Sequence, residues 1–387
     1  MKKLFFYSSI FLALLISWST SLKAQNYTYS VSTLLPEASH IIDDGLCLDE
    51  KGVLYGSYWG IWQGAAGTHI ARYRSDNVQI DTLAVGFIRP NGMSYKDGKV
   101  YVANGGTGSV LAIDTSGEVS LIVTIPGGVS NVLPQPDSDQ LIATAWGGKT
   151  IYNIDTNGLL TPMIESELFN GPVGAAYDDE GILYIGNFND GKIIMVKDNQ
   201  AEVFADLKGG IGFLTYSQGS ILATNHTDKK VYSIDIATQE IEVIAGSGEA
   251  VIRDGVGTAA AFRSPNGIVA TSSGDTIYVS EFAGKALRMI VRTSQTTTNT
   301  SNILQDLDFQ IFPNPAIDRI QLSYSSLGQI QKGIITDNRG RVVLPIELEE
   351  LRKKEIDLSR LSSGIYYLSL YNKQGKSVGT LKFPVLK

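Results

Sequence analysis

The chain has 387 residues, 43% of them hydrophobic, which is enough for one large and one small domain. Its 40 glycines, 18 tyrosines and single cysteine indicate a turn-rich β protein and exclude a disulfide framework. The net charge is −7, and residues 25–305 carry 17 Lys and Arg against 30 Asp and Glu, a balance that excludes nucleic acid as a partner.

Residues 1–24 have the pattern of a secretion signal. Lys2 and Lys3 precede an apolar run over residues 4–18, and Ala24 supplies a small residue for cleavage. No cysteine follows that would carry a lipid anchor, so we expect the mature chain to begin at Gln25. No later apolar run is long enough for a transmembrane helix, so we predict an exported protein with no membrane span after signal removal.

One supersecondary unit recurs six times in the middle of the chain. Each copy is an apolar strand, a polar Gly/Asp turn and a second apolar strand. The copies cover residues 44–59, 91–105, 131–146, 173–188, 211–226 and 266–282. Their starts are about 38 to 55 residues apart, and a third and a fourth strand follow most pairs. This spacing predicts the four-stranded blades of an all-β, six-bladed β-propeller over residues 25–292.

The sixth copy has no fourth strand of its own, because Arg292 leads directly into the polar stretch TSQTTTNTSN. Residues 27–35 have the missing alternating pattern. We therefore predict that this N-terminal strand closes the ring against the third strand of blade six and covers an edge that would otherwise be exposed. Cys47, in the first copy, is predicted to be a buried packing residue.

The C-terminal part separates from the ring by composition. Residues 293–305 form a Ser/Thr-rich linker that cannot pack a core. In residues 306–387, Pro313 and Pro315 exclude a central strand and predict an edge or turn that leads into a strand over residues 319–324. Alternating runs such as GIYYLSLY then predict a small Ig-like β-sandwich.

The hairpin geometry places two columns of residues on one face of the ring. The first strand leaves this face and the second strand returns to it, so strand starts and strand ends lie together. The starting residues are Asp44, Asn91, Asn131, Val173, Ile211 and Asn266. The ending pairs are Tyr58-Trp59, Asn104-Gly105, Ala145-Trp146, Asn187-Phe188, Asn225-His226 and Glu281-Phe282. Two insertions, residues 60–71 and 245–265, are predicted to cover the same face as lids.

These columns supply three sets of candidate residues. Oxygen-bearing side chains suit a hard divalent cation such as calcium or magnesium, and the candidate ligands are Asp44, Asn91, Asn131 and Asn266. Aromatic walls with a few polar groups suit a small ligand, and the candidates are Trp59, Asn104, Trp146, Asn187, Phe188, Asn225 and Phe282. Candidate acid–base residues are His226, Glu281 and His69. The alternative for each Asn is a turn residue that bonds its own backbone.

Residues 254–290 resemble an NHL repeat, and residues 25–292 are similar to the six-bladed superfamily of gluconolactonase/regucalcin, strictosidine-synthase-like proteins and virginiamycin lyase. Gluconolactonase-like enzymes hold a divalent metal with a Glu at the start of blade one, Asn residues at later starts, and an Asp that is ligand and base. The resemblance implies that Asp44 takes the Glu position and that Asn91, Asn131 and Asn266 take Asn positions. Val173 and Ile211 depart from the pattern, so a catalytic base would come from elsewhere.

The tail resembles the type A C-terminal sorting domain of type IX secretion cargo, known from Bacteroidetes. The resemblance rests on Phe312-Pro313-Asn314-Pro315 and Gly364-Ile365-Tyr366. It implies the type IX secretion machinery as a partner of residues 306–387. The alternative is an ordinary Ig-like adhesion module.

We expect a secreted or cell-surface propeller that passes through the periplasm and binds a ligand or divalent cation on one face. A metal-dependent hydrolase or lyase is the first alternative. A surface module that binds a protein or a glycan is the second.

Overall fold

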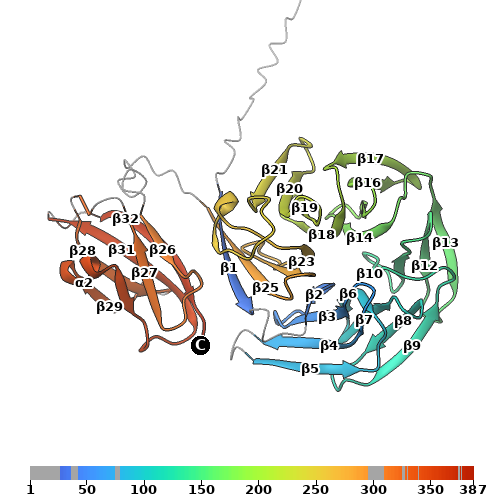
Figure 1. Cartoon of the computed structure of the whole chain (residues 1–387), viewed down its shortest axis with the longest axis horizontal. Coiled ribbons are helices and arrows are strands. Elements are labelled where there is room, and N and C mark those ends of the chain that lie inside the picture. Colours follow the sequence, from blue (N-terminus) through green and yellow to red (C-terminus); the bar gives the residue numbers. More distant parts are fainter. Residues whose placement is uncertain are drawn as a thin grey trace, which may run out of the picture.

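Apolar strands separated by Gly and Asp turns fold residues 27–294 into six antiparallel sheets arranged around a central axis (Figure 1). The structure is a computed structural model that describes residues 27–35, 42–74, 79–294, 309–324, 327–328, 330–338, 340–373, 375 and 377–387. The predicted signal peptide, residues 1–24, and linker residues 295–305 lie outside the described residues.

Five of the six sheets contain four strands that pair in chain order, as the repeats predict. Blade one consists of β2 (Leu46–Leu48), β3 (Leu54–Gly60), β4 (Ala66–Arg74) and β5 (Gln79–Val85). Blade two consists of β6 (Pro90–Lys96), β7 (Lys99–Asn104), β8 (Ser109–Ile113) and β9 (Val119–Thr124). Blade three consists of β10 (Asn131–Pro134), β11 (Leu141–Thr144), β12 (Thr150–Ile154) and β13 (Leu160–Glu165). Those of blades four and five are β14 (Pro172–Tyr177), β15 (Leu183–Asn187), β16 (Lys192–Lys197) and β17 (Gln200–Asp206), then β18 (Ile211–Ser217), β19 (Ser220–Asn225), β20 (Lys230–Asp235) and β21 (Ile241–Ala245).

The sixth sheet joins the two ends of the propeller. Its strand order is β22-β1-β25-β24-β23, with β1 (Tyr27–Leu35), β22 (Gly255–Val256), β23 (Pro265–Ala270), β24 (Thr276–Glu281) and β25 (Leu287–Ser294). A short 3₁₀ helix, η2 (Gly257–Ala259), follows β22. Strand β1 runs antiparallel to β25 from the pair Tyr27–Ser294 to the pair Leu35–Leu287. The predicted closure by the N-terminal strand is therefore confirmed.

The innermost strands form a closed ring. Strand β2 contacts β6, and contacts continue through β10, β14 and β18 to β23, which contacts β2 again. Apolar clusters fill the spaces between neighbouring sheets; one of them joins Cys47 and Tyr55 of blade one to Met93 and Val102 of blade two. Cys47 is buried, as predicted.

The C-terminal residues form two sheets that face each other. One has the order β26-β27-β30, with β26 (Gln310–Phe312), β27 (Arg319–Ser323) and β30 (Glu355–Asp357). The other has the order β29-β28-β31-β32, with β28 (Ile330–Asp337), β29 (Val342–Glu347), β31 (Gly364–Asn372) and β32 (Ser377–Val385). Strand β26 lies at an edge and ends before Pro313, as the prolines predict.

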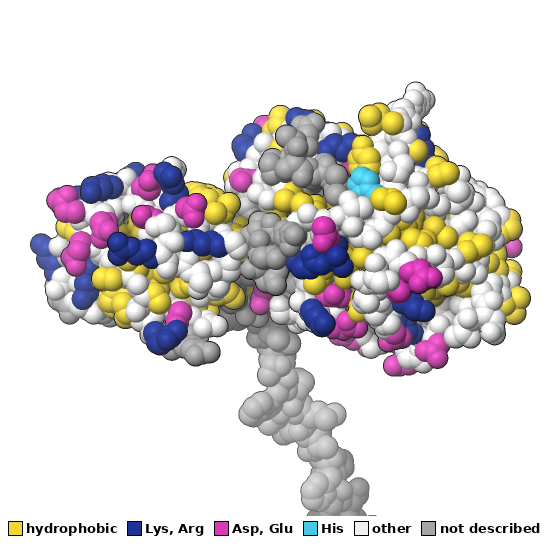
Figure 2. All heavy atoms as spheres, turned by 90° about the horizontal axis from the view of Figure 1, so that it is seen from below, with side chains coloured by type: hydrophobic (Ala, Val, Ile, Leu, Met, Phe, Trp, Pro, Cys, Tyr) yellow, Lys and Arg dark blue, Asp and Glu magenta, His cyan; other side chains and the backbone are white. Residues whose placement is uncertain are grey.

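This domain has its own apolar core, which includes Ile320, Ile335, Leu368 and Phe383 from both sheets. One short helix, α2 (Leu348–Lys353), was not predicted; Glu347 and Glu350 form a capping box at its start. Figure 2 shows Lys and Arg side chains spread over the visible surface of the domain.

Candidate functional site

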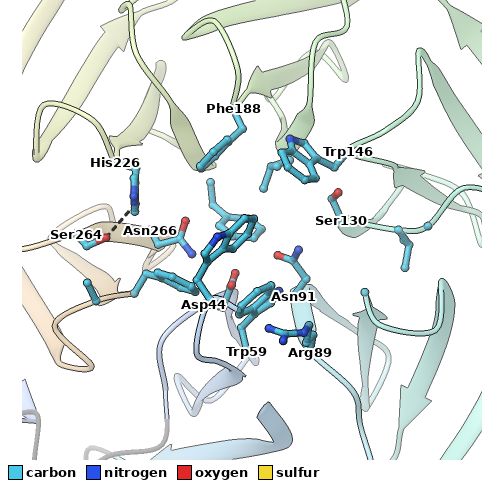
Figure 3. Close-up of a pocket in the computed structure, with 18 of the residues that line it drawn as sticks. Asp44, Trp59, Arg89, Asn91, Ser130, Trp146, Phe188, His226, Ser264 and Asn266 are labelled. Atoms are coloured by element: carbon cyan, nitrogen blue, oxygen red, sulfur yellow. Dashed lines mark hydrogen bonds between the residues drawn. The ribbon is translucent and has the colours of Figure 1, made fainter. Parts of the chain in front are cut away.

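The face that carries the strand starts encloses a cavity of about 870 Å³ (Figure 3). The innermost strands provide its floor, and the connections between strands provide its walls. The side chains that form it are Asp44, Asn91, Ser130, Val173, Phe213 and Asn266 from the strand starts, and Trp59, Trp62, Arg89, Trp146, Phe188, His226, Lys229, Arg263, Ser264 and Phe282 from the connections. A cavity of this size suits a drug-sized molecule.

Three of the four predicted cation ligands, Asp44, Asn91 and Asn266, lie at the floor, but Asn131 does not line the cavity. In blade three Val132 pairs with Ala143. In blade two the equivalent pair is Met93 with Val102, so the two blades can be aligned on these pairs. The equivalent of Asn91 is therefore Ser130, and Asn131 takes the position of a glycine. Its Oδ1 accepts a hydrogen bond from the Val132 N–H at 2.9 Å.

Blade five is also one residue away from the predicted register. Leu214 pairs with Ala223, so Gly212 takes the floor position and Phe213 reaches the cavity. Ile211 is fully buried in the cluster between blades four and five. Neither blade three nor blade five begins with the Asn-Gly pair that marks the register in blades two and six.

Asp44 is the one acidic side chain of the cavity wall, and its carboxylate is incompletely bonded. The residue is 4% exposed, and its Oδ1 has no hydrogen-bond partner. Burial, followed by the neighbouring charge of Asp43, raises the pKa of Asp44 well above its ordinary value. Lys285, the Gly45 N–H and the Asn266 side chain oppose this shift. A buried oxygen without a partner is costly unless a ligand satisfies it.

The neighbouring Asp43 has a structural role that the sequence does not reveal. Its carboxylate accepts hydrogen bonds from the backbone N–H groups of Trp59 (2.6 Å) and Gly60 (3.2 Å) and pairs with Lys285. Asp43 thereby fixes the backbone that presents Trp59 to the cavity.

The cavity has aromatic walls, and all four predicted aromatic residues, Trp59, Trp146, Phe188 and Phe282, belong to them. Phe282 packs edge-on against Trp59, with ring centroids 5.4 Å apart, and Trp146 packs edge-on against Phe188 at 6.2 Å. Trp62, which the prediction missed, stacks on Trp59 at 5.8 Å and is 60% exposed.

The three predicted ligand-binding asparagines Asn104, Asn187 and Asn225 do not line the cavity. Each is buried and forms a hydrogen bond with the backbone of the segment that leads into its own blade. Asn104 Oδ1 accepts from the Ile88 N–H, the Asn187 amide donates to the Leu168 carbonyl, and the Asn225 amide donates to the Lys208 carbonyl. The alternative of turn and loop chemistry applies to these three residues.

Glu281 and His69 also lie outside the cavity wall. Glu281 is fully buried, accepts a hydrogen bond from the Ser264 N–H at 2.7 Å and forms an ion pair with buried Arg288 at 3.0 Å. In blade six, Glu281 therefore has the role that the three asparagines have in their own blades. His69 lies on β4 and stacks on Tyr58, with ring centroids 5.0 Å apart.

His226 does line the cavity, between Phe188 and Phe282. Its Nδ1 lies 2.9 Å from Ser264 Oγ (Figure 3). Burial, and then the charge of Lys229, lowers the pKa of His226. Since the ordinary pKa is about 6.5, the imidazole is largely neutral at pH 7.

The first insertion covers the cavity, as predicted, but mainly as an extension of the β3–β4 hairpin. Its turn, residues 61–65, carries Trp62. The Arg89 guanidinium donates to the carbonyls of Ile61 (3.2 Å) and Gly64 (3.0 Å), which ties this turn to blade two.

The second insertion is not a lid over most of its length, so that prediction is wrong. Gly255 and Val256 of β22 pair with Val31 and Ser30 at the outer edge of blade six, where they cover the free edge of β1. Its last part does reach the cavity, through Arg263 and Ser264.

The electrostatics of Asp44 give a first testable expectation. Because its folded-state pKa is raised, the ionised carboxylate destabilises the cation-free protein most above that pKa. The penalty shrinks as the pH falls below it and is gone only below the ordinary pKa of the unfolded chain. With a chelator present, Asp44→Asn should raise the free energy of unfolding at pH 8 by about 1–3 kcal/mol. The gain, measured by urea denaturation, should shrink at pH 5. Asp97→Asn, in the β6–β7 turn, should show no such gain.

The fold and the cavity define a β-propeller with an aromatic-walled pocket, followed by a separate β-sandwich. Residues 310–382 match the secretion system C-terminal sorting domain family. The C-terminal domain is therefore a sorting domain, which implies type IX secretion and export to the cell surface or the medium. Among the described residues, no helix is long and apolar enough to cross a membrane. No curated protein matches the chain in sequence.

Solved structures share the fold of the propeller. A protein of unknown function from Bacteroides thetaiotaomicron aligns with a TM-score of 0.61 and 15% identity over 69% of this chain and 77% of its own. An auxiliary nutrient binding protein from Bacteroides ovatus aligns with a TM-score of 0.58 and 12% identity, over 70% of this chain and 78% of its own. A gluconolactonase from Xanthomonas campestris aligns with a TM-score of 0.53 and 15% identity, over 68% of this chain and 89% of its own. At these identities the likeness is one of fold.

Proposed function

We propose that this protein is an exported small-molecule-binding propeller whose ligand occupies the cavity above a divalent cation held at the floor. The observation that carries the proposal is the buried Asp44 Oδ1, which has no protein partner and lies at the floor of a cavity of about 870 Å³. The gluconolactonase and the nutrient binding protein with the same fold are consistent with a small-molecule site in such a cavity.

The residues at the floor fit a weak site for a hard cation. Asp44 would supply the one charged oxygen, and Asn91, Ser130 and Asn266 would supply neutral oxygens, the ligand types that calcium and magnesium prefer. Among the residues that the structure describes, no three His, Cys, Asp or Glu side chains group into a metal site. A single carboxylate therefore distinguishes this site from a high-affinity one. A bound cation would neutralise Asp44 and hold an electronegative group of the ligand.

Calcium or magnesium should stabilise the protein, because a ligand that binds only the folded state adds about 2.7 kcal/mol at 100 times its dissociation constant. We expect the melting temperature to rise with cation concentration. Asp44→Asn should abolish the rise, since it removes the only charged oxygen, and Asn91→Ala should weaken it. The matched control is Asp97→Asn, which lies in the turn between Lys96 and Lys99 at the opposite end of the strands. An unresponsive wild type would contradict the cation site.

The second candidate function is hydrolysis or elimination. It is favoured by the hydrogen bond between His226 and Ser264, because a neutral imidazole beside a hydroxyl is the arrangement that activates a nucleophile or removes a proton. A lactone and ester panel tests it. Activity that Ser264→Ala and His226→Gln both abolish, while cation stabilisation persists, would establish catalysis.

A further inference from the structure

The charged side chains of the cavity are mostly cations. Arg89, Lys229 and Arg263 line it, against the single carboxylate of Asp44. The propeller as a whole has the opposite balance, because residues 25–305 carry almost twice as many acidic as basic side chains. Positive charge is therefore concentrated in the cavity against the overall charge of the domain, and such a cleft attracts anions.

Two of these cations have no carboxylate partner. Among the described residues, no ion pair joins Arg89 or Lys229 to an acidic side chain. The lysines that begin the strands after such turns do have partners: Lys192 of β16 lies 3.7 Å from Asp190, and Lys230 of β20 lies 4.0 Å from Asp228. The positive charge of the cavity is thus left for a ligand to neutralise.

Arg89 is held in place on an aromatic surface. Its guanidinium lies 4.2 Å from the centroid of the Trp59 ring, and two of its N–H groups donate to the carbonyls of Ile61 and Gly64. A guanidinium fixed in this way loses little freedom when it binds a planar anion. Lys229 lies on blade five, across the ring from Arg89 on blade two, beside the imidazole of His226.

The walls between the cations are apolar and flat. Above the floor they consist mainly of the rings of Trp59, Trp62, Trp146, Phe188 and Phe282. Trp62 and Trp146 leave 60% and 47% of their surface exposed. An apolar, planar ring can stack on such walls.

We propose that the ligand of this cavity is a small organic anion with an apolar, planar ring: the ring stacks on the tryptophans, the acidic group pairs with Lys229, and Arg89 adds to the positive charge of the cavity. This inference rests on the proposed ligand-binding function and names its substrate class. It uses wall residues that play no part in the proposed cation site.

A charge-matched pair of probes tests the proposal. 2-Naphthoate and 2-naphthamide have nearly the same shape and differ in charge. By calorimetry at about 20 mM salt, 2-naphthoate should bind at least about tenfold more tightly, and about 0.5 M salt should remove most of the advantage. Glucuronate, an anion without an apolar ring, should bind more weakly than 2-naphthoate.

Two variants separate the charge from the ring. Lys229→Gln should weaken 2-naphthoate about fivefold or more and leave 2-naphthamide unchanged. Glutamine suits this position, because Gln63, Gln218 and Gln239 have the same positive φ as Lys229. Trp62→Ala should weaken both probes. The controls are Lys208→Gln, at an exposed ion pair, and Leu121→Ala, at an exposed apolar position; both lie outside the cavity.

Each outcome decides the proposal. Equal affinity for the two naphthalene probes, or an unchanged 2-naphthoate affinity in Lys229→Gln, overturns the claim that the ligand is an anion. If Trp62→Ala still weakens binding in that case, the cavity remains supported as a ligand-binding site. Tighter binding of glucuronate than of 2-naphthoate overturns the claim that the ligand carries an apolar ring. Absence of binding by every probe at millimolar concentration overturns the inference, and the Asp44-dependent cation response then decides the proposed function separately.

Discussion

Removal of residues 27–35 should lower the melting temperature of the propeller by about 10 °C or more. Strand β1 pairs with β25 along its length, and Tyr29, Val31 and Leu35 are buried in the clusters around blade six. Loss of several buried side chains together with one sheet edge costs about 5 kcal/mol or more. In a domain of this size, each kcal/mol corresponds to roughly 2–4 °C. Differential scanning calorimetry measures the change.

A point variant keeps this expectation testable if the deletion does not fold. Val31 is 3% exposed, so Val31→Ala should cost about 2 kcal/mol. The neighbouring Ser30→Ala is the control and should stay within about 0.5 kcal/mol. A deletion variant that melts at the wild-type temperature would show that β1 does not hold the ring closed.

Deletion of residues 306–387 should stop export after the inner membrane and leave a folded propeller in the periplasm. The sorting domain has its own core, and the propeller ring closes without it, so the truncated chain should keep a cooperative melting transition. Cell fractionation and immunoblotting should find nearly all of the truncated protein in the periplasm. Normal amounts on the surface or in the medium would contradict the role of the tail.

A gain-of-function control makes the export test specific. Residues 306–387, fused behind the linker to a periplasmic reporter, should carry the reporter to the cell surface or the medium. The same fusion with Phe383→Asp should not, because Phe383 is fully buried in the core of the sorting domain.

Most of the fold could be predicted because two local signals agree along the chain. Alternation of apolar and polar residues predicts strands, and Gly/Asp turns mark their ends. The turn between β6 and β7 illustrates this, since Asp97 and Gly98 both have positive φ, as the turn in a tight hairpin requires. The closing strand was also predictable, because blade six visibly lacked one strand.

The site was only partly predictable because its geometry depends on single-residue register. The pairing shifts by one residue near the start of blades two, four, five and six. Such irregularities turn a side chain toward the cavity or into the sheet, and the sequence does not mark them where the Asn-Gly pair is absent. Phe213 was missed for this reason, and Ser130 was missed because blade three has no Asn-Gly pair to mark its register. Arg89 and Trp62 were missed because their positions depend on contacts between different blades.

The closure of blade six also determines when this protein can become complete. Val31 near the start of the propeller pairs with Ile290 near its end, so the first strand of the ring to be made waits for one of the last. Contacts between such distant segments form slowly, because the whole intervening chain has to be ordered first. Until then, blade six presents an open strand edge that can pair with another chain. The period before the ring closes is therefore when this protein is most prone to aggregation.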